Sequence, residues 1–152
     1  MKILIAILLL ASSNAFAANA FDNFLGNYYV VDQKCSGPEG CDRTAVNVGY
    51  DGNTLRLYEI YPQGSSGFPI YEKSEQGDYG YTKATVTGDA NHAEWIYQQR
   101  IRQFAGPELT EIDEARTLDR KGDTVYYFFY HREKRPLSGE WSISRNYTLK
   151  KK

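Results

Sequence analysis

Residues 140–150 read Glu-Trp-Ser-Ile-Ser-Arg-Asn-Tyr-Thr-Leu-Lys, so that large side chains alternate with small polar ones. Successive side chains of a β-strand point to opposite faces of its sheet, so positions two apart share a face. The large side chains on one face are Trp141, Ile143, Tyr147 and Leu149. The other face carries serine, asparagine, threonine and lysine. This pattern predicts a strand that packs one face on a core and turns the other to water.

Short runs of β-branched and aromatic residues recur along the chain and are separated by turn residues. The runs are Leu25–Gln33, Thr44–Tyr50, Thr54–Tyr61, Phe68–Lys73, Asp78–Thr87, His92–Gln103, Leu109–Leu118, Thr124–Arg132 and Glu140–Lys150. Shared faces are expected for Val46, Val48 and Tyr50, and for Ala93, Trp95, Tyr97 and Ile101. The glycines of Asp51-Gly52-Asn53 and Lys121-Gly122-Asp123 suit tight hairpin turns. Closing such a meander hides its apolar faces and removes its edges. We therefore expect an all-β fold, an up-and-down antiparallel β-barrel of eight or nine strands.

Composition agrees with one folded domain. The chain has 152 residues, of which 41% are hydrophobic and 14% aromatic, with 13 tyrosines and a single methionine. Tyrosine and glycine suit strands and turns better than helices. The formal net charge of −1 leaves no basic surplus for a run of phosphates, so nucleic acid is not an expected partner.

The N-terminus has the three parts of a signal peptide. Met1-Lys2 precedes an apolar run from Ile3 to Leu10, and Ala15-Phe16-Ala17 is a small-x-small cleavage site. The run is shorter than the roughly 20 residues that span a bilayer, so no integral membrane span is expected. Ala18-Asn19-Ala20 is a second acceptable site. We expect residues 1–17 to be removed and residues 18–152 to form one domain in the periplasm or outside the cell.

The chain has two cysteines, Cys35 and Cys41, which enclose a loop rich in glycine and proline. In an exported protein this arrangement favours a disulfide. Metal binding would need more ligands than the neighbourhood offers. The loop is short, so chain entropy limits the stabilisation to roughly 2 kcal/mol.

The first predicted strand contains Phe24-Leu25-Gly26-Asn27-Tyr28-Tyr29-Val30-Val31. It resembles the first-strand signature of the lipocalins, with Tyr28 in place of the family's tryptophan after Gly26. Lipocalins also carry a basic residue on the last strand that packs across the first-strand aromatic, and Arg145 lies on the apolar face of residues 140–150. The resemblance implies a barrel whose first and last strands are neighbours and whose end is closed by Gly26, Tyr28 and Arg145. Gly122-Asp123-Thr124-Val125-Tyr126 is similar to the middle lipocalin motif only in part.

No established catalytic motif is present in the sequence. His92 and His131 are expected at strand ends, where exposed or hydrogen-bonded histidines are common. Among the acidic residues Glu108, Glu111, Asp113 and Glu114, Glu111 and Asp113 share a strand face without an apolar setting. We therefore expect these carboxylates to be solvated, and we expect no catalysis, no metal and no cofactor.

Residues 126–130 place aromatic side chains on both faces of one strand, with Tyr127 and Phe129 on one side. The candidate ligand-binding residues are Tyr28, Tyr97, Tyr127, Phe129 and Trp141. These aromatics favour an exported, lipocalin-like carrier for a small apolar or aromatic-stacking ligand. A small barrel filled by its own side chains is an equal alternative. A second function is a protein-interaction module, such as an inhibitor that acts through barrel loops.

Overall fold

The computed structural model describes residues 19–37, 41–102 and 109–152. Ten strands follow one short 3₁₀ helix, η1 (Ala20–Phe24). The strands are β1 (Gly26–Ser36), β2 (Ala45–Asp51), β3 (Thr54–Tyr61), β4 (Gly64–Pro69), β5 (Lys73–Gly77), β6 (Gly80–Gly88), β7 (His92–Arg102), β8 (Leu109–Lys121), β9 (Thr124–Arg135) and β10 (Gly139–Lys151). The all-β prediction is confirmed.

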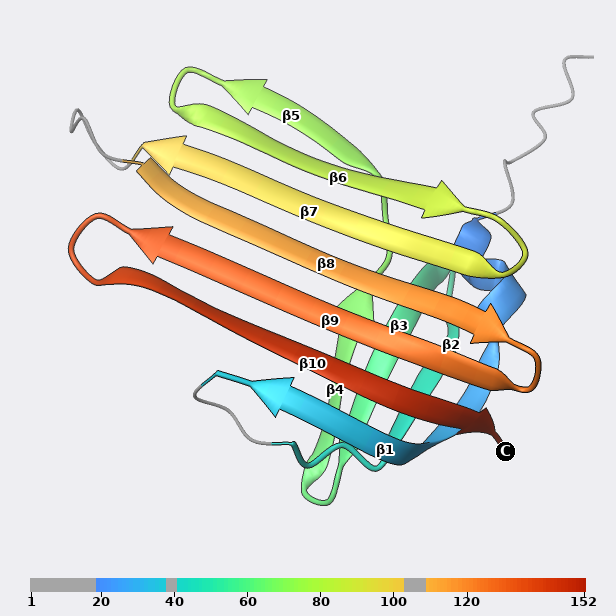
Figure 1. The fold of residues 1–152 in the computed structure, drawn as a ribbon. Coiled ribbons are helices and arrows are strands. Elements are labelled where there is room, and N and C mark those ends of the chain that lie inside the picture. The colour runs from blue at the N-terminus through green and yellow to red at the C-terminus, as the bar shows by residue number, and fades with distance from the viewer. Residues whose placement is uncertain (1–18, 38–40, 103–108) are drawn as a thin grey trace, which may run out of the picture.

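All ten strands form one antiparallel sheet in the order β4-β3-β2-β1-β10-β9-β8-β7-β6-β5. Strands that are neighbours in sequence pair with each other, except β4 and β5, and β1 pairs with β10. The sheet folds over on itself: β5 to β10 lie in one layer, and β2, β3 and β4 cross behind it at a steep angle (Figure 1). The first and last strands are therefore neighbours, as expected, and the core lies between the layers.

The prediction of a closed barrel of eight or nine strands is wrong in strand number and in closure. The predicted strand Phe68–Lys73 spans a break between β4 and β5. At this break the chain leaves one edge of the sheet and starts the opposite edge. Ile70 N–H donates to the Leu55 carbonyl, and the Trp95 indole donates to the Tyr71 carbonyl. These bonds tie the connection to β3 and β7, and β4 and β5 do not pair with each other.

The apolar half of the interior lies at the end where η1 packs between the layers. Phe21 and Phe24 of η1 are fully buried there. They join a cluster that includes Tyr28, Val46, Val48, Leu57, Ala93, Leu118 and Leu149. Asn19 caps the helix, because its side chain accepts from the Phe21 N–H. We call this the closed end of the molecule, and the opposite end of the interior the open end.

The predicted faces hold in most strands. Ile143, Tyr147 and Leu149 are buried, and Tyr127 and Phe129 point inward from β9. Trp141 shares the inward face of β10 but remains 40% exposed. Tyr50 was expected to share a face with Val46 and Val48, but it is not buried with them. Its side chain is 54% exposed, since it lies at the end of β2 and donates to Asp22 at the surface.

Cys35 and Cys41 form a disulfide, as predicted. A disulfide is compatible with an exported protein. In the described part of the chain, no helix is long and apolar enough to cross a membrane. The predicted signal peptide, residues 1–17, lies outside the described residues.

Candidate functional site

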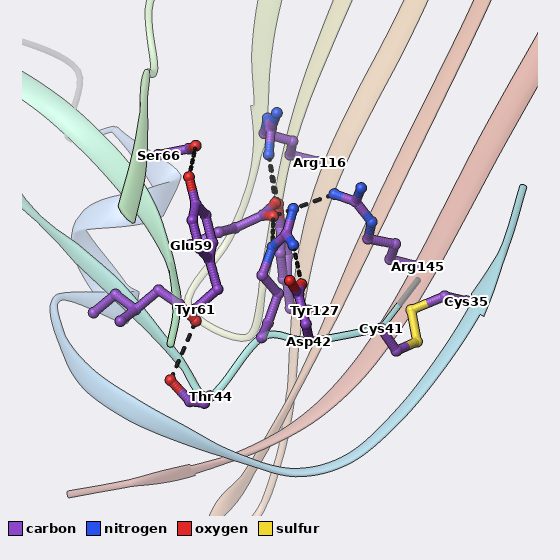
Figure 2. A network of polar contacts seen from close by, with 12 residues as sticks. Cys35, Cys41, Asp42, Thr44, Glu59, Tyr61, Ser66, Arg116, Tyr127 and Arg145 are labelled. Carbon is purple, nitrogen blue, oxygen red and sulfur yellow. Dashed lines mark hydrogen bonds and ion pairs between the residues drawn. A yellow bond between two sulfur atoms is a disulfide. The ribbon is translucent and has the colours of Figure 1, made fainter. Parts of the chain in front are cut away.

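The candidate site begins at a buried carboxylate halfway along the interior. Glu59 follows Leu55 and Leu57 on the inward face of β3, and its side chain is fully buried. One carboxylate oxygen, Oε1, accepts from Arg116 Nη1 at 3.0 Å and from the Tyr127 hydroxyl at 2.6 Å. The other, Oε2, accepts from Arg43 Nε at 2.9 Å and Arg145 Nη1 at 3.4 Å (Figure 2). Four side chains from different segments therefore converge on one carboxylate.

Arg116 of β8 is the second centre of this cluster and is also fully buried. Its guanidinium carbon lies 3.5 Å from the ring centroid of Phe68 and 4.4 Å from that of Phe129. Arg116 Nε and Nη2 both donate to Glu114 Oε1, at 3.0 and 2.8 Å. The two aromatic faces and two carboxylates replace the water that the guanidinium loses on burial.

The charged groups of the cluster stabilise one another in their charged forms. Burial by itself raises the pKa of Glu59, but Arg116, Tyr127 and Arg43 outweigh burial and hold that pKa below its usual value. Burial likewise favours the neutral form of Arg116, yet the carboxylates Glu114 and Glu59 raise its pKa above the ordinary value. Burial raises the pKa of the Tyr127 hydroxyl well above 10. The cluster therefore consists of charged acids, charged bases and a protonated tyrosine.

The disulfide helps to bring Arg43 to this cluster. Cys35 lies near the end of β1, and the Cα atoms of Cys35 and Cys41 are 5.7 Å apart. The bond anchors the segment that carries Asp42 and Arg43 beside β10. Arg43 then pairs with both Asp42 and Glu59 and stacks on the Tyr61 ring at 4.9 Å.

At the open end the inward faces of β8, β9 and β10 form a rim whose most exposed side chain is Trp141. His131 Nδ1 lies 3.1 Å from Glu114 Oε2, and its Nε2 lies 3.8 Å from Glu133 Oε2. The ring of Trp141 stacks on the His131 ring at 4.9 Å between centroids. We call Glu114, His131, Glu133 and Trp141 the rim site.

The rim site joins the buried cluster through one shared carboxylate. Glu114 accepts from Arg116 on its inner side and contacts His131 on its outer side. Burial raises the pKa of Glu114, but His131 and Arg116 lower it more, so Glu114 is charged. The contact orients the His131 ring, whose Nε2 has no hydrogen-bond partner among the described residues. That nitrogen is buried from solvent, so Trp141 supplies the accessible surface of the rim site.

The structure separates the five aromatics that we proposed as ligand-binding residues. Tyr28 is buried at the closed end, where its hydroxyl donates to the Phe24 carbonyl. Tyr127 and Phe129 are packed in the buried cluster. Tyr97 stacks on Trp95 at 5.8 Å, on β7. Trp141 alone of the five has a large exposed surface, so the aromatics do not line one common pocket.

The predicted contact between Arg145 and Tyr28 is not formed. Register places Arg145 opposite Cys35 and Tyr28 opposite Lys151, so the two lie about 20 Å apart along the sheet. Arg145 instead pairs with Glu59 and lies 5.3 Å from the Phe129 ring centroid. At the closed end it is the guanidinium of Arg120 that lies over an aromatic ring, that of Phe24.

Gly26 has a different local role from the one that the resemblance implied. Its φ of 140° favours glycine, and the Lys151 side chain passes directly beside its Cα. A methyl group at Gly26 would lie 3.0 Å from Lys151 Cε. Gly26 thus lets β1 begin close to the end of β10.

The acidic residues fall on both faces of β8. Glu111 and Asp113 lie on the outward face, as predicted, but they are ion-paired rather than only solvated. Asp113 bonds to Arg100 and Arg132 at 2.7 Å each, and Arg132 continues to Glu140 at 2.8 Å. Glu114 points inward, which periodicity alone did not single out. Glu108 lies outside the described residues.

The two histidines also differ from their expected surroundings. His92 starts β7 and bonds to Asp119 at 2.7 Å, and this hydrogen bond raises the pKa of His92. His131 lies within β9 rather than at its end, on the inward face. The predicted role of a hydrogen-bonded histidine at a strand end fits His92, whereas His131 belongs to the rim site.

The central residues of the site, Glu59 and Arg116, were missed by sequence reasoning. A signal was present: each sits at an inward position of an alternating strand, Glu59 after Leu55 and Leu57, and Arg116 before Leu118. A charge at such a position requires a buried partner. Their pairing across 57 residues of sequence was not readable from either strand.

No family model matches this chain, and no curated protein is significantly similar to it. Within residues 19–37, 41–102 and 109–152, no three potential metal ligands gather into a site. The lipocalin resemblance therefore stays a prediction.

Proposed function

We propose that this protein is an exported binding protein that holds a small ligand at the rim site. The observation that carries the proposal is Trp141. Its side chain lies on the core face of β10 and yet is 40% exposed, stacked on His131. Exposed aromatics with one face already packed offer large contact area at small entropic cost.

The rim site favours a planar ligand that also carries a polar group. A ring can stack beside Trp141, while the His131 ring and the Glu133 carboxylate lie next to it. The interior behind the rim is charged and filled, because Glu59, Arg116 and Tyr127 occupy it. These observations favour an aromatic-stacking ligand over a purely apolar one enclosed in the interior.

Tryptophan fluorescence offers a direct test, because the chain has two tryptophans and Trp95 is buried. A Trp95→Phe variant leaves Trp141 as the reporter. We expect a panel of small heteroaromatic compounds to contain one that quenches this signal saturably, and native mass spectrometry of gently purified protein to retain that class of mass.

A matched pair of variants checks that the ligand binds at the rim site. Trp141→Ala should weaken binding of the ligand at least about tenfold, since stacking of this kind contributes 1–3 kcal/mol. Tyr126→Ala removes an aromatic of similar exposure, 43%, from the outer face of β9 and should leave binding unchanged. Equal losses in both variants, or no saturable ligand in the panel, would contradict the proposal.

A protein-interaction module is the second candidate, because Leu137 in the turn between β9 and β10 is fully exposed. A fully exposed leucine at the tip of a hairpin is accessible for insertion into a cleft of another protein. A protein captured by the wild-type chain, lost with Leu137→Ser and retained with Trp141→Ala, would favour this function over ligand binding.

A further inference from the structure

A second region of interest lies at the closed end, away from the rim site. The last residues of β8 and β10 and the first residues of β9 meet there (Figure 1). Lys121 and Lys150 both pair with Thr124, and Lys151 pairs with Tyr28. Neighbouring strands are about 4.8 Å apart, so these side chains start close together. The basic residues gathered here are Arg120, Lys121, Lys150, Lys151 and Lys152.

These five cations differ from most others in the protein. Across the residues that the structure describes, none of the five has a carboxylate within 4 Å, whereas Arg43, Arg100, Arg116 and Arg132 are all ion-paired. Neutral groups hold two of the five in place. Arg120 donates to the Asn23 carbonyl, and Lys150 Nζ donates to Thr124 Oγ1 at 2.7 Å. The positive charge is thus positioned without being neutralised.

A pocket of about 580 Å³ opens between these side chains. Its walls include Arg120, Lys150, Lys151, Tyr28 and Tyr29, and its acidic member is Asp123. Lys151 lies across Gly26, whose missing side chain leaves room for this approach. Three cations, two of them held by hydrogen bonds, therefore face one cavity that contains one carboxylate.

We propose that this pocket binds the phosphate group of an anionic ligand, either free in solution or as a lipid headgroup. Like charges that face one cavity repel one another, and a dianion between them relieves that repulsion. Phosphate presents several acceptor oxygens to arginine and lysine donors. The tyrosine walls and the volume leave space for the organic part of a phosphoester. This site is independent of the rim site and of its proposed ligand.

The test uses the mature chain at low ionic strength, with inorganic phosphate, pyrophosphate and glycerol phosphate measured by calorimetry. We expect saturable binding of at least one of them that weakens as salt is added. Lys151→Gln should weaken it about tenfold, the loss of one charge-assisted hydrogen bond. Lys83→Gln is the matched control, because Lys83 is an exposed, unpaired cation on β6, outside the pocket. That control should bind as the wild type does.

Vesicles distinguish the two sources of the phosphate group. Saturable binding of soluble phosphate compounds without binding to phosphatidylglycerol vesicles assigns the site to a free phosphoester. Vesicle binding that Lys151→Gln weakens and Lys83→Gln does not assigns it to a headgroup. The proposal is overturned when neither probe binds, or when both variants weaken binding equally, since the latter indicates only a general attraction to anions. Circular dichroism of each variant verifies that the sheet is intact.

Discussion

The two halves of the interior are built on the same strands but by different chemistry. Leu57 and Glu59 are two residues apart on β3, point into the same space and are both fully buried. Around Leu57 the neighbours are apolar side chains and the phenylalanines of η1. Around Glu59 they are three guanidiniums and a tyrosine hydroxyl.

The difference between the halves shows what burial requires of a residue. The apolar half stabilises the fold through water exclusion, which has no preferred direction. The charged half must position every partner, since a buried charge without one costs several kcal/mol. We therefore expect it to contribute less net stability than the apolar half and more specificity of packing. It also ends at the rim site, where the polar groups meet solvent.

The largest effect is expected when the central carboxylate loses its charge. Glu59→Gln keeps the side-chain volume but leaves Arg116, Arg43 and Arg145 around a neutral amide. The free energy of unfolding should fall by about 3–5 kcal/mol, as measured by urea denaturation. Leu57→Ala should cost about 2–5 kcal/mol through its cavity. A loss under about 1 kcal/mol for Glu59→Gln would remove the distinction between the halves.

Acid should act on the charged half of the interior and on the outer-face ion pairs of Asp113 and Glu140, but not on the apolar half. The folded-state pKa values of Glu59 and Glu114 are held below their usual value of 4.5. The stability that they contribute is therefore present above pH 4.5 and is lost as pH falls through the folded-state values. Denaturation at a series of pH values from 7 to 3 should show this decline. The decline should be shallower in Glu59→Gln and unchanged in Leu57→Ala.

Removing the disulfide should have a smaller effect on stability. The Cys35→Ser, Cys41→Ser double variant should lose roughly 2 kcal/mol, because the bond closes a short loop. It should also loosen Arg43, since the bond anchors the segment that carries it. A double-mutant cycle with Arg43→Gln measures that link. Strict additivity would show that the disulfide does not position Arg43.

The Tyr127 hydroxyl allows the two halves of the interior to be compared through the loss of a single hydroxyl group. It donates to Glu59 and lies 2.6 Å from Arg116 Nη1. Tyr127→Phe should lower the free energy of unfolding by about 1–3 kcal/mol, because it leaves these buried partners short of one bond. Tyr28→Phe, at the apolar end, removes a single bond to the Phe24 carbonyl. An equal or larger loss at Tyr28 would reverse the expected ranking.

The outer face should show the smallest effect. Asp113 bonds to Arg100 and Arg132, but water reaches this ladder. Asp113→Asn should change the free energy of unfolding by about 0.2–1 kcal/mol, as for other half-exposed ion pairs. Added salt should reduce the difference further. A loss as large as that of Glu59→Gln would show that exposure does not set the strength of these pairs.

Much of the fold could be predicted because the pattern of a strand is visible in neighbouring residues. Alternation identified the inward faces of β9 and β10, and Lys121-Gly122-Asp123 marked the hairpin between β8 and β9. The disulfide followed from two cysteines in one loop. The site was less readable, since of the five proposed aromatics Trp141 alone stands at the rim. A partner for Arg145 was correctly required, but the partner is Glu59 rather than Tyr28.

The sequence by itself determined the all-β class, the order of the hairpins, the inward faces and the disulfide, because each depends on neighbouring residues and on the two-residue period of a strand. Only the tertiary structure decided that the sheet stays unclosed between β4 and β5 and that Glu59 meets Arg116. The physical reason is the same for both. The pairing register and the folding of the whole sheet set which distant strands face each other. Ion pairs form only between side chains that are close in space.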